Sequence, residues 1–275
     1  MSRAKMWSVL SKSTREKRRF RRGVYLLPSV FTVANMFCGW ASIVFAMRAD
    51  YMTAAPFIGF AMVLDVLDGR IARLTGATSD FGEQFDSLAD VVSFGVAPAV
   101  LVFAWGLEPL GSIGWAVGFL WLSATAVRLA RFNIQAQAPD KRYFLGLPSP
   151  PAAGVPAATV FFFPQGPQDI GGVLAALLIV IVPAALMVSR LRYRSFNALL
   201  PGHRRSSLTP LVIAAVIAAI AAQPQAVLMV MSYTYLCSGP IGSFLSNRSA
   251  RRAARSKFEP IPIDERPRPA SRNAS

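Results

Sequence analysis

Charged and metal-binding side chains are scarce in this chain of 275 residues. Only 16% of the residues are charged, whereas about a quarter are charged in a typical soluble domain. The two cysteines, Cys38 and Cys237, lie in separate apolar stretches, which excludes a disulfide framework and a cysteine-based metal site. The single histidine, His203, lies between arginines in a polar segment and is expected to be solvated. These absences exclude an ordinary cytosolic enzyme and favour a membrane protein.

Apolar residues make up 53% of the chain and occur in long runs. A helix needs about 20 residues to cross the hydrocarbon core of a bilayer. The pattern predicts an all-α fold, a polytopic membrane bundle of about eight helices, of which the fifth and seventh are short. So many long apolar runs are unlike a small nucleic-acid-binding fold, and no nucleic-acid partner is expected. The predicted spans are 26–47, 53–74, 87–106, 112–134, 150–164, 171–189, 208–222 and 225–245.

Positive charge is in excess and is unevenly distributed. The chain has 29 Lys and Arg against 14 Asp and Glu, a net charge of +15. Cytoplasmic loops of membrane proteins carry the excess of Lys and Arg. If the N-terminus is inside, the inner segments hold every Lys and Arg except Arg48. We therefore expect both termini in the cytoplasm. These inner segments are 1–25, 70–86, 128–149, 190–207 and 246–275.

The spans and charges divide the chain into three regions. Residues 1–25 are a basic segment, either an interfacial helix that binds anionic lipid or a tail that only fixes topology. Residues 26–245 form the transmembrane domain that carries the candidate site. Residues 246–275 contain four prolines among scattered arginines and predict a basic, disordered cytoplasmic tail.

Four aspartates lie at the predicted cytoplasmic ends of the second and third spans. An ionised carboxylate in a transmembrane helix costs at least about 2.5–3.5 kcal/mol. Asp65 and Asp68 are three residues apart and Asp86 and Asp90 four apart, so each pair lies on one face of its helix. A hairpin through 75–84 would bring the two faces together. Carboxylate oxygens favour Mg²⁺ or Mn²⁺ over zinc, so the sequence predicts a divalent metal site.

Small and basic residues are interleaved with these acids. Gly69 and Ala72 continue the face of the first aspartate pair, and Gly82 precedes the second pair by one turn. Missing side chains would let a phosphate-bearing ligand approach the backbone; the alternative is close packing of helices, which is common in membranes. Arg70 and Arg73 place positive charge beside the carboxylates, as a phosphate-bearing ligand requires.

The complete pattern from Asp65 to Asp90 is D-x2-D-G-x2-A-R-x8-G-x3-D-x3-D. It resembles the signature of the CDP-alcohol phosphotransferase family in every fixed position and spacing. The resemblance implies transfer of a phosphatidyl group from a CDP-linked lipid to an alcohol, with release of CMP. It also implies an all-helical membrane fold that is often homodimeric. The family core has six helices, so the last two predicted spans would add to it.

The acceptor alcohol is indicated by a second resemblance. The segments ANMFCGWASI at 34–43, FDSLADVVSFGVAPA at 85–99, RLARFN at 128–133 and GLPSP at 146–150 are similar to bacterial members that use L-serine. This likeness implies the inner membrane of a bacterium, with the site on the cytoplasmic side. Glycerol 3-phosphate and inositol phosphate are the alternative acceptors. A cation or proton-coupled transporter is disfavoured because the acids are bunched at the cytoplasmic edge of one hairpin rather than at midplane.

The resemblance also implies roles for individual residues. Asp65, Asp68, Asp86 and Asp90 would hold one or two Mg²⁺ or Mn²⁺ ions against the diphosphate of CDP-diacylglycerol, and Asp90 would also act as the general base. The CDP-binding residues would be Gly69, Ala72, Arg73 and Gly82.

The acceptor site is expected at the inner end of the fourth span. Arg128 or Arg131 could pair with the serine carboxylate and Asn133 with its ammonium or hydroxyl group. The alternative is that the arginines are topology-setting residues whose charges reach the interface. Ser93 lies one turn beyond Asp90 and could face the same site or bond to its own helix.

Overall fold

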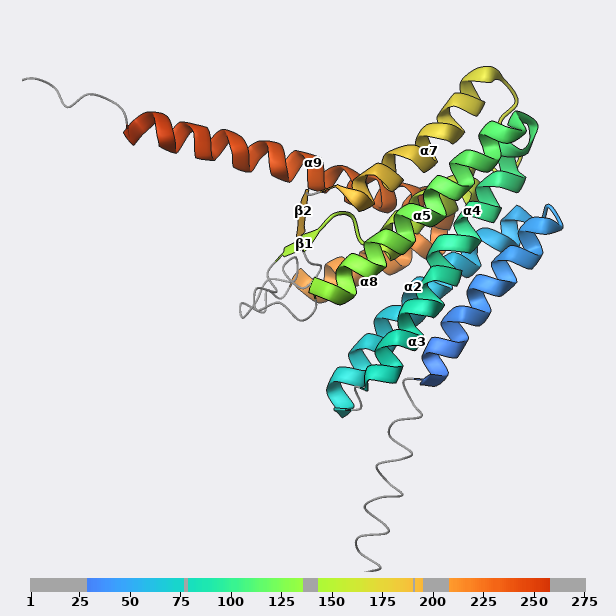
Figure 1. Cartoon of the computed structure of the whole chain (residues 1–275), viewed down its shortest axis with the longest axis horizontal. Coiled ribbons are helices and arrows are strands. Elements are labelled where there is room, and N and C mark those ends of the chain that lie inside the picture. The colour runs from blue at the N-terminus through green and yellow to red at the C-terminus, as the bar shows by residue number, and fades with distance from the viewer. Residues whose placement is uncertain (1–28, 77–78, 136–142, 190, 195–207, 258–275) are drawn as a thin grey trace, which may run out of the picture.

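The computed structural model of the chain describes residues 29–76, 79–135, 143–189, 191–194 and 208–257. Most of these residues are helical, and the helices form an elongated bundle (Figure 1). The predicted all-α class is therefore confirmed. The basic segment 1–25 lies outside the described residues, and so does the end of the tail from 258 onward.

The first three helices are joined by two tight turns. The helix Ser29–Met47 leads through Ala49, whose φ is 57°, to α2 (Tyr51–Thr75). The N-cap of α2 is Asp50, whose side chain accepts a hydrogen bond from Thr53 N at 3.2 Å. Helix α2 ends at Gly76, which has a left-handed φ of 62° that glycine adopts without steric cost.

Helix α3 (Asp80–Asp90) returns beside α2. Its N-cap is Ser79, whose hydroxyl accepts a hydrogen bond from Gly82 N at 3.0 Å, as Ser commonly does at this position. The chain therefore reverses between Gly76 and Ser79. The predicted hairpin that joins the two aspartate pairs is confirmed.

The third span continues from Asp80 to Leu110 and contains two π-helical turns. After α3 it passes through η1 (Val91–Val96), α4 (Ala97–Val102), η2 (Phe103–Leu107) and η3 (Glu108–Leu110). Two side chains bond carbonyls within the π turns: Trp121 Nε1 donates to Phe94 O at 3.0 Å, and Tyr51 Oη donates to Ala104 O at 2.7 Å. Turns of this kind are rare and often occur at functional sites. Here the first follows Asp90 directly.

Five more helices and one strand pair complete the described fold. Strands β1 and β2 pair antiparallel, with Tyr143 opposite Arg194, and this pairing was not predicted. It links the segment before α6 to the segment after α7, two segments that the charge distribution predicts to lie on the same side of the membrane. The remaining elements are α5 (Ser112–Gln135), β1 (Tyr143–Leu145), α6 (Ser149–Phe162), α7 (Ile170–Val188), β2 (Arg192–Arg194), α8 (Leu208–Ala222) and α9 (Pro224–Lys257).

Five described helices are long and apolar enough to cross a membrane, against eight predicted spans. They are Ser29–Met47, Tyr51–Thr75, Asp80–Leu110, Ser112–Ile134 and Ile170–Val188. Helices α6 and α8 have 14 and 15 residues, or about 21–23 Å at the usual rise per residue. That is shorter than a hydrocarbon core of about 30 Å, in agreement with the short fifth and seventh spans expected from the sequence.

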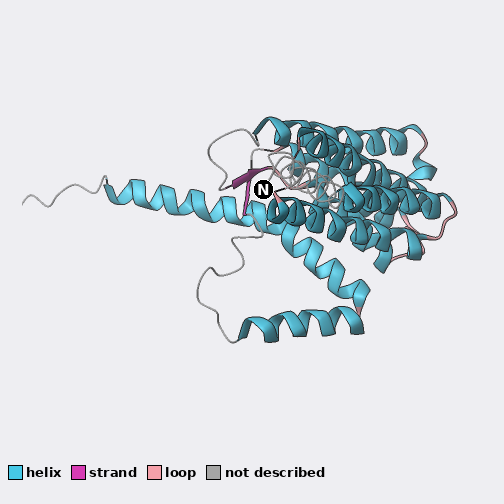
Figure 2. Ribbon diagram, turned by 90° about the horizontal axis from the view of Figure 1, so that it is seen from below, coloured by secondary structure: helices cyan, strands magenta, loops and turns pink. Residues whose placement is uncertain are grey.

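Helix α9 is longer than the eighth predicted span. It continues to Lys257, so the first part of the predicted disordered tail is helical, while the span boundary predicted at 245 stays a prediction. The C-terminal part of α9 projects away from the bundle (Figure 2). Its proximal part packs against α6, and Leu236 belongs to the buried core. The eighth predicted span therefore packs on α6 and contributes Leu236 to the core.

Helix α6 lies at the centre of the bundle, in contact with α2 on one side and α9 on the other. Ten of its 14 residues are buried. Ala152, Ala153 and Gly154 are among them, and small residues of this kind let helix backbones approach closely. Helix α5 packs against α7 and η1, which brings its C-terminal half toward the α2–α3 hairpin.

Candidate active site

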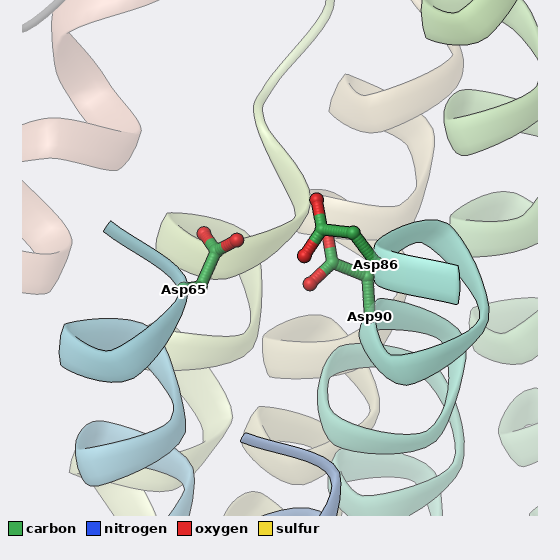
Figure 3. Close-up of side chains that lie close together, drawn as sticks. All are labelled: Asp65, Asp86 and Asp90. Carbon is green, nitrogen blue, oxygen red and sulfur yellow. The ribbon is translucent and has the colours of Figure 1, made fainter. Parts of the chain in front are cut away.

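Three carboxylates converge between α2 and α3. Asp65 comes from α2, and Asp86 and Asp90 come from successive turns of α3 (Figure 3). Each offers an oxygen atom within 4.8 Å of the other two. Asp90 is 7% exposed, while Asp65 and Asp86 are half-buried. The predicted convergence of the two aspartate pairs is therefore present for three of the four residues.

The fourth aspartate, Asp68, has a different partner. It is buried and accepts a hydrogen bond from Thr32 Oγ1 on the helix Ser29–Met47. It lies outside the group of three, but it remains within electrostatic range of Asp65 and Asp86. The N-terminal helix thus takes part in the organisation of the acidic cluster, which the sequence did not predict.

Asn35, one turn after Thr32, links the same helix to Asp90. It is fully buried, and its Nδ2 donates to Asp90 Oδ1 at 3.4 Å. Its backbone carbonyl accepts a hydrogen bond from Ser93 Oγ at 2.9 Å. Ser93 therefore bonds to a neighbouring helix rather than to its own. The polar pair Thr32 and Asn35, three residues apart in an apolar span, is the sequence signal that could have identified both residues.

The acidic cluster suits a divalent cation. Three carboxylates in a largely apolar bundle repel one another unless a positive charge compensates them. Asp86 Oδ1 is buried and has no hydrogen-bond partner among the described residues, and an unpaired buried oxygen is costly. Carboxylate oxygens are also the ligands that Mg²⁺ and Mn²⁺ prefer. The residues present therefore fit such an ion.

Gly69 and Gly82, predicted to bind the CDP group, do not lie at crowded helix contacts. A Cβ at Gly69 would meet only Arg73 Nη2 within 4 Å, at 3.8 Å, and a Cβ at Gly82 would meet only Ser79 Oγ, at 3.1 Å. Ala72 is half-buried and Arg73 is exposed, with Arg73 Nε donating to Gly69 O at 2.7 Å. Within the described part of the chain, no neighbouring helix crowds either glycine, although a Cβ at Gly82 would press on the N-cap hydroxyl of its own helix; their role in CDP binding stays a prediction.

Arg128 of α5 lies beside the acidic cluster. Its side chain is 9% exposed and is within electrostatic range of Asp65 and Asp90. Its Nη1 donates to Ser149 Oγ at the start of α6 at 2.6 Å, and its guanidinium lies 5.4 Å from the ring centroid of Phe132. Burial at this level is unlike an arginine that only sets topology.

The other two polar residues of this segment have separate surroundings. Asn133 Nδ2 donates to Ser87 Oγ at 3.0 Å, and Ser87 directly follows Asp86 in α3. Arg131 is half-buried, and its Nη1 donates to Val188 O at the C-terminal end of α7 at 3.0 Å. The structure therefore places Arg128 beside the carboxylates, Asn133 against Ser87 of α3 and Arg131 at a helix end.

Comparison with known proteins agrees with this arrangement. The family model described as CDP-alcohol phosphatidyltransferase matches residues 25–238. The chain belongs to this family. Together with the five long apolar helices, membership in the CDP-alcohol phosphatidyltransferases makes it an integral membrane protein, and the family is generally dependent on divalent metals. The match includes α8 and the proximal part of α9.

Several curated members of the family share the same name, CDP-diacylglycerol–serine O-phosphatidyltransferase. The protein from Helicobacter pylori (strain ATCC 700392 / 26695) is 38% identical over 179 residues, which cover 63% of this chain and 74% of the relative. The Mycobacterium leprae (strain TN) protein is 33% identical over 264 residues, 86% of this chain and 87% of the relative. The Bacillus subtilis (strain 168) protein is 37% identical over 125 residues, which cover 45% of this chain and 69% of the relative.

Proposed function

We propose that this chain is a CDP-diacylglycerol–serine O-phosphatidyltransferase, which converts CDP-diacylglycerol and L-serine into phosphatidylserine and CMP. The observation that carries the proposal is the convergence of Asp65, Asp86 and Asp90 on the α2–α3 hairpin, inside the region that matches the family. Serine as the acceptor is supported by the names of relatives from three bacterial genera.

The acidic cluster would bind one or two Mg²⁺ or Mn²⁺ ions. Asp65, Asp86 and Asp90 offer oxygens that already lie together, and Asp68 would supply the fourth carboxylate. When bound, the metal would neutralise the diphosphate of the lipid substrate and stabilise the departing CMP. The face of α2 and α3 with Gly69, Ala72, Arg73 and Gly82 would bind the CDP group.

Asp90 would accept the proton of the attacking alcohol. The serine hydroxyl oxygen attacks the phosphorus that carries diacylglycerol, the bond from this phosphorus to the CMP oxygen breaks, and the hydroxyl proton passes to the Asp90 carboxylate. The hydrogen bond from Asn35 fixes one oxygen of that carboxylate. Because a carboxylate is a weak base, proton transfer follows most of the bond formation to phosphorus.

The serine itself would be held by α5. Arg128 would pair with the serine carboxylate, and Asn133 would bind the ammonium or hydroxyl group. Ser93, whose hydroxyl donates a hydrogen bond to the Asn35 carbonyl, would contribute to the acceptor site from η1. Arg131, whose bond to Val188 O directs it to the end of α7, would contribute positive charge at that end of the helix.

The acceptor is tested with purified full-length protein. CMP release is measured with CDP-diacylglycerol and Mg²⁺ or Mn²⁺, in the presence of serine, glycerol 3-phosphate or inositol phosphate. We expect release with serine. Release only with glycerol 3-phosphate or with inositol phosphate would overturn the serine assignment, and no release with any of the three would overturn the transferase proposal, leaving cation or proton transport as the alternative to measure.

A further inference from the structure

Arg128 is enclosed by three helices, although the sequence indicated only the one that carries it. Its own helix supplies the ring of Phe132. The first residue of α6, Ser149, is fully buried and accepts the guanidinium's hydrogen bond at 2.6 Å. Helix α9 supplies Tyr235, which is half-buried and within electrostatic range of Arg128. Helix α6 thus brings a hydroxyl group to the side chain that would bind the acceptor, and α9 brings a tyrosine within its electrostatic range.

The packing of α9 on α6 explains how Ser149 and Tyr235 come to lie near the same arginine. The two helices are in direct contact along the core, and a hydrogen bond of 2.9 Å joins Thr159 Oγ1 to Tyr233 Oη. Leu236, next to Tyr235, is in the buried core. These contacts determine which face of α9 packs on α6. They therefore also hold Tyr235 near Arg128.

A buried arginine needs such partners to bind a ligand in one geometry. Arginine loses up to about 2 kcal/mol of rotamer freedom when its side chain is fixed. Its planar fork recognises a carboxylate by two parallel hydrogen bonds only in the correct orientation. The bond to Ser149 uses one of five N–H donors and so restrains the orientation of the guanidinium plane.

We infer that Ser149 of α6 and Tyr235 of α9 are positioning residues for acceptor binding, acting through Arg128. The inference rests on the proposed function, because it assigns these residues to the acceptor side of that reaction. It also gives the C-terminal helix a role: α9 completes the surroundings of the acceptor-binding arginine instead of only enlarging the bundle.

Steady-state kinetics of the full-length enzyme in detergent micelles test the inference. Ser149→Ala should raise the KM for serine about tenfold, the equivalent of about 1.4 kcal/mol, and leave the KM for CDP-diacylglycerol within about twofold. Tyr235→Phe should raise the KM for serine by a smaller factor. Ser149→Thr, which keeps the hydroxyl, should restore a KM for serine close to that of the wild type.

Tyr233→Phe is the matched control, because it removes a hydroxyl from α9 two residues away that bonds to Thr159 instead of Arg128. It should leave the KM for serine unchanged. An unchanged KM for serine in both Ser149→Ala and Tyr235→Phe would overturn the inference, and so would an equal rise for both substrates in all three variants. If Ser149→Ala does not fold, the KM for serine of Tyr235→Phe is compared with that of Tyr233→Phe. Equal values in these two variants would then overturn the inference.

The same experiment separates this inference from the proposed function. Wild-type turnover with serine tests the function, whereas the ratio of variant to wild-type KM tests the positioning. If the wild type releases CMP only with another anionic acceptor, the serine assignment fails. The inference then stands or falls on the KM for that acceptor.

Discussion

The carboxylate of Asp90 has two proposed roles, metal binding and proton acceptance. It belongs to the group of three acids that fits a cation, and in the proposed reaction it also takes a proton. The Nδ2 of Asn35 binds its Oδ1, so the two oxygens are not equivalent. Asp86 differs, because its Oδ1 is buried and has no hydrogen-bond partner in the described part of the chain. The two residues should therefore respond differently to loss of charge.

Asp90→Asn is expected to lower kcat by at least about 10²-fold, because general base catalysis usually contributes that much or more. CDP-diacylglycerol should still bind, since Asp65 and Asp86 remain. Turnover is measured by CMP release and lipid binding by equilibrium dialysis. Asp80→Asn, an exposed site at the start of α3, is the control. A near wild-type rate in Asp90→Asn would remove this residue from its role.

Asp86→Asn is expected to weaken metal binding directly. Loss of even an outer partner of a metal ligand typically costs about tenfold or more in affinity, so loss of a ligand charge should cost at least that. Electron paramagnetic resonance of Mn²⁺ titrated into the purified protein measures the affinity without turnover. Asp80→Asn again serves as the control, and equal Mn²⁺ affinity in the two variants would contradict the assignment of Asp86.

At the scale of elements, the site depends on the contact between the helix Ser29–Met47 and η1. The first helix presents Thr32 and Asn35 to the carboxylates, and at Gly39 it lies close to Ser93 of η1. A Cβ at Gly39 would lie 2.6 Å from Ser93 Oγ and 2.7 Å from Ser93 Cα. Since one of these atoms is backbone, the helices would have to separate to admit a methyl group.

Gly39→Ala should therefore destabilise the fold by about 1–3 kcal/mol, the usual cost of overpacking a core. The matched control is Gly59→Ala in α2, where a Cβ would have no described atom within 4 Å and alanine is the better helix former. Thermal unfolding of the two variants in the same detergent gives the comparison. A Gly39→Ala protein as stable as Gly59→Ala would disprove the close contact.

The hairpin and its acids could be predicted from the sequence because the residues that form them are close together in the chain. Asp65 to Asp90 span one helix–turn–helix unit, and spacing alone places each pair on one face. Asn35, Ser149 and Tyr235 could not be found in this way, because each meets its partner across a long stretch of chain, and only tertiary packing brings them together. The π turns after Asp90 also escaped prediction, since η1 keeps the apolar composition of an ordinary span.

At the scale of the whole molecule, the distribution of positive charge predicts which end of the bundle faces the cytoplasm. The α2–α3 turn, β1 and β2 all belong to segments on the basic side, and the turns before α2 and before α7 belong to the other side. The acidic site lies at the basic end, where positive charge can attract anionic lipids. The cytoplasmic location of the site and the homodimer remain predictions.

Labelling of introduced cysteines tests the orientation. In a background with Cys237→Ser, which removes the exposed native thiol, a membrane-impermeant maleimide is applied to intact spheroplasts. Gln165→Cys, in the loop between α6 and α7, should react. Asp80→Cys, at the start of α3, should react only after the membrane is permeabilised. The reverse pattern would show that the site faces away from the cytoplasm.

The transfer itself is tested most directly by following the serine. Purified protein is incubated with CDP-diacylglycerol, a divalent metal and isotopically labelled L-serine, and lipid-bound label and CMP are quantified together. We expect labelled phosphatidylserine and CMP in equal amounts, and loss of both in Asp90→Asn. CMP release without label in the lipid, or labelled lipid formed equally well by Asp90→Asn, would contradict the proposed reaction.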